Sequence, residues 1–179
     1  MNKVIETISY PQLSKIKIDK KYTIPTLKQV MHIVDGKVPL LLDIMPSSKA
    51  NFERAIYEAL KNYKGEFAVC SANPYILEWF KLNAPTFKRG QRVSRFKKEK
   101  PTYAKKRVLS KMKLNHLSEP NFLLVKVEDA RKLKTKKLIK KGNNVVLWTI
   151  KDKKALRKAK DYKSNFIYEG EDLICKFED

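Results

Sequence analysis

Residues 67–82, FAVCSANPYILEWFKL, contain one complete strand–helix unit. The first seven are mostly small and apolar, which predicts a strand over Phe67–Asn73. Pro74 follows, and proline suits the first position of a helix because no N–H donor is needed there. Apolar side chains including Ile76 and Phe80 then recur at helical spacing. A strand that leads directly into a helix is typical of an α/β fold.

The same alternation continues on both sides of this stretch. Further strands are expected at 38–45, 87–93, 121–127, 145–150 and 165–168, and further helices at 26–34, 49–63, 103–114, 130–140 and 153–162. Segment 38–45, VPLLLDIM, is apolar on both faces and predicts a buried parallel strand. About six such units indicate βαβ connections around a parallel sheet. Periodicity alone leaves open a doubly wound sheet and a barrel, and a complete barrel needs eight units and about 250 residues.

The length of 179 residues suits one domain. We divide it into a lead-in segment (1–25), a strand–helix region (26–170) and a short tail (171–179). The first residues lack the apolar region of a signal peptide, and no apolar run approaches the roughly 20 residues of a membrane span. We therefore expect a cytoplasmic protein. Cys70 and Cys175 are expected to be packing residues rather than a disulfide.

The net charge of +21 favours contact with polyanions. Twelve Lys or Arg residues and one acid, Glu99, lie between residues 88 and 113, and further basic clusters cover 131–141 and 151–163. No zinc finger, aromatic RNP strand or GXXG loop accompanies this charge, which argues against a dedicated nucleic-acid surface. The remaining readings are an ordinary lysine-rich solvent face and a weak attraction to phosphate-bearing ligands or to a membrane surface.

Working residues of α/β barrels lie where the strands end. Asp43, inside LLLDIM, is costly to bury unless it is paired or binds a metal. Ser71 and Asn73 precede Pro74, where turn and helix-capping roles are common. Arg89 either pairs with an acid or contacts a ligand, and Trp148 is either a core residue or a pocket wall. Neither His32 nor His116 has a partner that would make it a general acid or base.

Six segments in order carry a resemblance to a known family. They are IPTLKQVMHIVDGKVPLLLDIM (24–45), YKGEFAVCSANPYILEWFKLNAP (63–85), KRGQ (88–91), LNHLSEPNF (114–122), VVLWTIKD (145–152) and NFIYEG (165–170). Together they resemble the glycerophosphodiester phosphodiesterase family. That family implies a TIM-type barrel, which hydrolyses glycerophosphodiesters to an alcohol and glycerol 3-phosphate. Carboxylates hold a divalent metal, Mg²⁺ or Ca²⁺, and two histidines serve as acid and base.

The resemblance implies a metal ligand at Asp43 and substrate-binding roles for Ser71, Asn73, Arg89 and Trp148. It also departs from the family pattern. The family's HRG, Glu-x-Asp and His-Asp motifs, which belong before the IPTL helix, have no counterpart before Ile24. Asp43 stands for a Glu, and Met45 stands for a Lys.

We therefore expect an incomplete TIM-type barrel that lacks its first two strand–helix units and is inactive alone. The hypotheses left open are completion by a separate N-terminal segment or a second copy, and a non-enzymatic basic module that binds anionic, phosphate-rich surfaces. Open sheet edges predict self-association.

Overall fold

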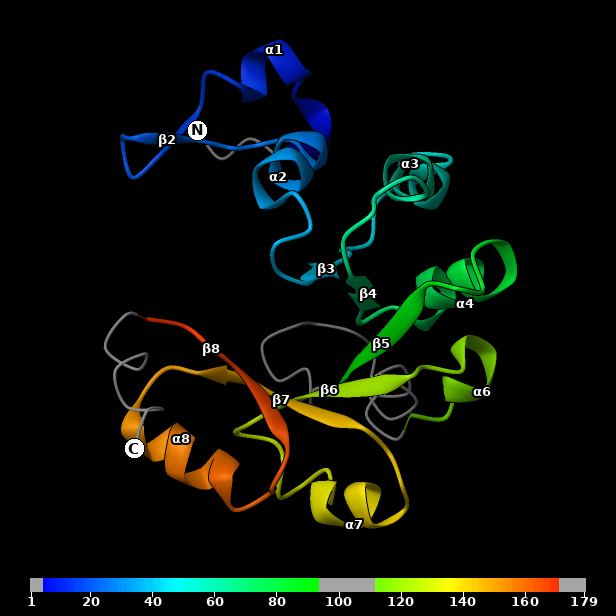
Figure 1. Cartoon of the computed structure of the whole chain (residues 1–179), viewed down its shortest axis with the longest axis vertical. Coiled ribbons are helices and arrows are strands. Elements are labelled where there is room, and N and C mark those ends of the chain that lie inside the picture. The colour runs from blue at the N-terminus through cyan, green and yellow to red at the C-terminus, as the bar shows by residue number, and fades with distance from the viewer. Residues whose placement is uncertain (1–4, 94–111, 171–179) are drawn as a thin grey trace.

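The computed structural model describes residues 5–93 and 112–170 (Figure 1). Its main sheet has six parallel strands in sequence order: β3 (Leu40–Asp43), β4 (Phe67–Ser71), β5 (Lys88–Val93), β6 (Phe122–Lys126), β7 (Val145–Ile150) and β8 (Asn165–Tyr168). The connecting helices are α2 (Leu27–Val34), α3 (Phe52–Leu60), α4 (Pro74–Asn83), α6 (Asn115–Ser118), α7 (Thr135–Lys140) and α8 (Lys153–Lys160).

The sheet curls, and α3, α4, α6, α7 and α8 follow its outer side (Figure 1). Each strand pairs in parallel with the next strand of the sequence, as successive strand–helix units in a barrel do. The expectation of an α/β fold with an incomplete TIM-type barrel is therefore confirmed. Among the described residues β3 and β8 form the two edges of the sheet, each with one neighbour. Self-association through these edges stays a prediction, to be checked by sedimentation.

Local sequence signals set the helix starts. The Thr26 hydroxyl accepts a hydrogen bond from the backbone N–H of Gln29, whose side chain returns to the N–H of Thr26, so a capping box opens α2. Asn73 caps α4 by accepting from the N–H of Tyr75, directly before Pro74. These contacts satisfy N–H groups that have no partner within the helix.

Two clusters of buried side chains lie between the helices and the sheet. One includes Leu60, Val69, Leu77 and Phe80 and joins α3 and α4 to the β3–β5 side. The other includes Val93, Leu123, Val125, Leu147 and Leu156 and joins α7 and α8 to β5, β6 and β7. The outer face of the curled sheet is therefore the one that packs on helices.

Several sequence expectations need correction. The strand over 38–45 is not buried on both faces, because β3 is an edge strand: Leu41 is 42% exposed, and Val38 and Met45 are more so. The helix expected at 49–63 begins only at Phe52. The helix expected at 130–140 begins at Thr135, because residues 127–134 form turns.

The remaining sequence expectations concern the two ends of the chain and one internal helix. The lead-in segment, for which no element was expected, forms a 3₁₀ turn (η1, Ile5–Thr7), α1 (Tyr10–Leu13) and an antiparallel hairpin of β1 (Lys17–Ile18) and β2 (Tyr22–Thr23). The helix expected at 103–114 lies mostly outside the described residues, as does the 171–179 tail. No described helix is long and apolar enough to cross a membrane.

Candidate functional site

The register of the strands assigns each side chain to one of two faces. Asp43, Cys70 and Gly90 form one row across β3, β4 and β5. Two residues further along β5, Arg92 shares the face of this row, because strand side chains alternate. The opposite face carries the residues that pack on helices, such as Val69 and Leu147. We call the face of Asp43 and Arg92 the concave face.

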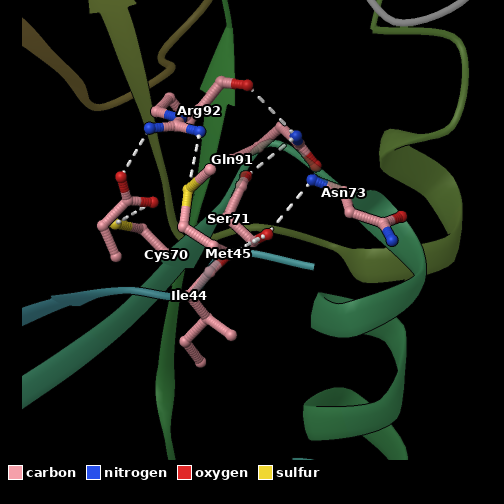
Figure 2. Close-up of polar contacts among 8 residues, drawn as sticks. Ile44, Met45, Cys70, Ser71, Asn73, Gln91 and Arg92 are labelled. Atoms are coloured by element: carbon pink, nitrogen blue, oxygen red, sulfur yellow. Dashed lines mark hydrogen bonds and ion pairs between the residues drawn. The ribbon is translucent and has the colours of Figure 1, made fainter. Parts of the chain in front are cut away.

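Asp43 and Arg92 form an ion pair on the concave face, where β3 and β5 end. Arg92 Nη1 lies 2.5 Å from Asp43 Oδ2, and the Arg92 and Asp43 side chains are 17% and 40% exposed. Arg92 Nη2 lies 3.5 Å from the sulfur of Met45 (Figure 2). The guanidinium also lies over the ring of Trp148, 5.6 Å from its centroid, which is cation–π geometry.

Cys70 lies beneath this ion pair. Its thiol is buried and donates to Asp43 Oδ1 at 3.7 Å (Figure 2). Burial and then the negative charge of Asp43 raise the pKa of the Cys70 thiol to about 12. A neutral thiol is a poor nucleophile, so Cys70 is a packing residue, as the sequence predicts.

Ser71 and Asn73 lie on the helix side rather than on the concave face. The Ser71 hydroxyl donates to the carbonyl of Ile44 at 2.7 Å and accepts from the N–H of Asn73 at 3.1 Å (Figure 2). Gln91 donates to the carbonyls of Ser71 and Ala72. This network ties the end of β3 to the start of α4. Substrate binding by Ser71 and Asn73 stays a prediction.

Arg89 is not brought near Asp43. It lies at the start of β5 on the helix face, where it is 7% exposed. Its guanidinium donates to the carbonyls of Phe87 at 2.8 Å and Ser118 at 3.2 Å, among others, so it secures the loops rather than pairing with an acid. Burial lowers the pKa of Arg89, which the charge of Glu119 opposes. Its substrate-binding role also stays a prediction.

Trp148 reaches the concave face and contacts Arg92. Its ladder partner on β6 is Lys126, so these two residues share a face next to Arg92. The indole Nε1 is buried and has no hydrogen-bond partner among the described residues. Lys126 is 41% exposed and makes only a long ion pair, 3.9 Å, to Glu128. Among the described residues, Arg92 and Lys126 therefore place positive charge on the concave face near the ends of β5 and β6, beside Trp148.

Asp43 does not fit a divalent metal in this setting. Mg²⁺ and Ca²⁺ take six or more oxygen ligands and are usually held by several carboxylates or carbonyls. Among residues 5–93 and 112–170 no group of three His, Cys, Asp or Glu side chains has the geometry to hold a metal. The one carboxylate at the end of β3 is already neutralised by Arg92.

Comparison with solved structures identifies the fold. The chain superposes on a glycerophosphodiester phosphodiesterase of Parabacteroides distasonis with a TM-score of 0.71 at 16% identity, over 97% of this chain and 71% of that one. For the Thermotoga maritima enzyme of the same name the TM-score is 0.62 at 21% identity, over 89% and 65%. An Oleispira antarctica phosphodiesterase bound to its product, sn-glycerol 3-phosphate, gives 0.58 at 22%, over 82% and 57%.

The chain therefore has the fold of the glycerophosphodiester phosphodiesterases and spans between about half and three quarters of the length of these three structures. No protein-family model matches the sequence, and no curated protein matches it significantly. At these identities the likeness establishes the fold, and the resemblance seen in the six sequence segments agrees with it.

The structure brings Asp43 and Trp148 together through Arg92, which sequence reasoning did not single out, and it did not single out Lys126 either. The metal-binding role of Asp43 and the substrate-binding role of Trp148 stay predictions. Alternation along the strand supplies part of the signal for Arg92, and the register between strands supplies the rest. Arg89 and Arg92 are three residues apart in KRGQRV, so they must point to opposite faces. Only Arg92 has the same parity as Gly90, which lies in the row of Asp43.

Proposed function

We propose that this chain binds a glycerophosphodiester, or its glycerol 3-phosphate part, on the concave face without hydrolysing it. The observation that carries the proposal is the Asp43–Arg92 pair. It removes the free carboxylate that metal-assisted hydrolysis would need and leaves cationic and N–H donors beside Trp148. Phosphate oxygens are well matched by such donors. The fold supports the choice of ligand, because the Oleispira phosphodiesterase binds sn-glycerol 3-phosphate.

Two measurements on the purified chain test this proposal. Calorimetric titration with glycerophosphocholine and with glycerol 3-phosphate is expected to show binding. Release of choline from glycerophosphocholine is expected to stay at background with Mg²⁺, with Ca²⁺ and with neither. Turnover that disappears in Asp43→Asn would overturn the non-hydrolytic assignment, and absence of binding would overturn the assignment of ligand. We also infer a cytoplasmic location, which fits the prediction that Cys70 and Cys175 form no disulfide.

A second candidate function rests on the basic outer helices. Residues 131–163 contain fourteen Lys or Arg residues and two acids. Lys136 of α7 lies over the ring of Tyr162, just beyond α8, at 5.6 Å, so two basic clusters that are separate in sequence adjoin in space. Most of these cations are exposed. We propose that this α7–α8 face binds anionic membranes, with about 1 kcal/mol gained for each basic residue near the surface.

Vesicle sedimentation separates this candidate from ordinary surface charge. The chain is expected to sediment with phosphatidylserine-containing vesicles at low salt and not with pure phosphatidylcholine vesicles. Reversing Lys137 and Lys140 of α7 to Glu should weaken that binding. Reversing Lys20 and Lys21 in the hairpin region gives a control of equal charge change. Equal loss in both variants, or stronger binding to duplex DNA than to vesicles, would contradict a membrane-binding α7–α8 face.

A further inference from the structure

Arg92 reaches across a whole strand to meet Asp43. Asp43 lies on β3 and Arg92 on β5, with β4 between them. On the concave face of β4 the residue in the row of Asp43 is Cys70, and Ala72 follows directly after the end of β4. Both side chains are small, so the guanidinium can pass over them. The pair therefore depends on the composition of three neighbouring strands.

Arg92 is also fixed on its other sides. The Met45 sulfur accepts from Nη2 at 3.5 Å, and the Trp148 ring lies on one face of the guanidinium. Its side chain is 17% exposed, so the charge is held in place yet reachable from solvent. An arginine that is planar, always charged and pre-positioned has less entropy to lose when it binds phosphate.

We propose that Arg92 is the built-in cation of this site, so that a phosphate ester binds here without any divalent metal ion. This inference rests on the proposed binding function and adds its chemistry. The remaining guanidinium N–H groups and the ammonium of Lys126 supply the contacts to phosphate oxygens, beside the ring of Trp148. Asp43 holds Arg92 in position but also competes with the ligand for its donors.

Titration in the presence and absence of metal tests the inference. Glycerol 3-phosphate is titrated into the full chain with EDTA, with Mg²⁺ and with Ca²⁺. We expect the same dissociation constant in all three. Binding that needs Mg²⁺ or Ca²⁺ would overturn the metal-free site and leave the proposed binding function standing. No binding under any condition would overturn both.

Variants identify the groups involved. Arg92→Met is expected to weaken binding on the order of tenfold or more, because charge-assisted hydrogen bonds are lost. The matched control is Arg54→Met, an exposed arginine of α3, with a change within about twofold because its charge is remote and screened. Arg92→Lys keeps the positive charge and serves as a second variant in case Arg92→Met does not fold. Asp43→Asn is expected to strengthen binding by about fivefold, since a partly exposed ion pair no longer competes.

Terbium provides a readout that is independent of the ligand. Tb³⁺ bound at Asp43 would lie close to Trp148, which can sensitise its luminescence. We expect the Tb³⁺ luminescence of the wild-type chain and of Asp43→Asn to be the same. A wild-type signal that Asp43→Asn abolishes would show that Asp43 holds a metal ion despite Arg92, and it would overturn the inference. Equal signals from both proteins would support it.

Discussion

Residues 7–43 and residues 44–170 have similar kinds of elements but very different burial. In the first region no residue is buried, although α2 is amphipathic and β3 is apolar. In the second region β7 alone contributes Val145, Leu147 and Ile150 to the core. The first region also leaves large apolar side chains open, with Ile33 72% and Val38 57% exposed.

Position in the sheet, rather than composition, explains the difference. β7 has strands on both sides and helices α7 and α8 packed over it. β3 has β4 on one side and no other neighbour among the described residues. Hydrophobic stabilisation follows the apolar area removed from water, so the same leucine stabilises the fold in one strand and not in the other. Stability should therefore be concentrated beyond residue 43.

The largest expected effect comes from one leucine in each region. Leu147 is fully buried, and Leu147→Ala should lower the free energy of unfolding by about 2–5 kcal/mol through lost contacts and a cavity. Leu41 lies 42% exposed on β3, and Leu41→Ala should cost below about 1 kcal/mol. Urea unfolding measures both. Similar losses would mean that β3 is as well buried as β7.

The next effect tests the packing of the concave face. A Cβ built on Gly90 would collide with the Phe122 ring and lie 2.8 Å from Leu124. Gly90→Ala should therefore destabilise by about 1–3 kcal/mol through overpacking. Adding Phe122→Leu, which removes the ring, should recover part of this loss, and double-mutant urea unfolding measures the coupling. If the stability losses of Gly90→Ala and Phe122→Leu simply added in the double variant, the expected collision with the Phe122 ring would be contradicted.

Alkaline pH gives a third test, through Cys70. Its pKa is raised from an ordinary 9.0 to about 12 in the folded chain, so the unfolded chain loses this proton first as pH rises. Stability linked to Cys70 is thus complete below about pH 9 and is lost between about pH 9 and pH 12, by up to about 1.4 kcal/mol per pH unit.

Comparing the wild-type chain with Cys70→Ala separates the stability contributed by Cys70 from that of all other groups. Unfolding of the wild-type chain and of Cys70→Ala is followed over the same pH range, and the wild-type curve should fall more steeply. Parallel curves would mean that Cys70 is not protected in the fold.

Much of the fold follows from the sequence because its strands are short apolar runs between clear helix signals. The bounds of β7 and β8 are predicted correctly, and Asn73 is the helix cap that its position before Pro74 suggests. The start of α7 is wrong by several residues, because the apolar residues of 127–133 pack in turns. Periodicity indicates which side chains are buried, but it does not show whether the backbone hydrogen bonds of that segment are those of a helix or of turns.

The site is harder to predict because it depends on residues that are distant in sequence. Asp43 and Trp148 are strand-end residues and can be found one strand at a time. The role of Arg92 depends on its reach across β4, which depends in turn on the small side chain of Cys70 and on the parity of β5. Choosing between Arg89 and Arg92 requires the register between strands, which sequence alone does not supply.

The smallest expected effect compares the helix caps of the two regions. The Asp152 carboxylate accepts from the N–H of Ala155 at 2.7 Å and caps α8, so Asp152→Ala should lower the global free energy of unfolding by about 1 kcal/mol. Thr26→Ala removes an equivalent cap from α2, which contributes no buried residue. Its effect should be confined to faster hydrogen exchange of α2 amides, with a global change within about 0.5 kcal/mol. If Thr26→Ala cost as much global stability as Asp152→Ala, α2 would unfold together with the buried region, and the contrast between the two regions would not extend to their cooperativity.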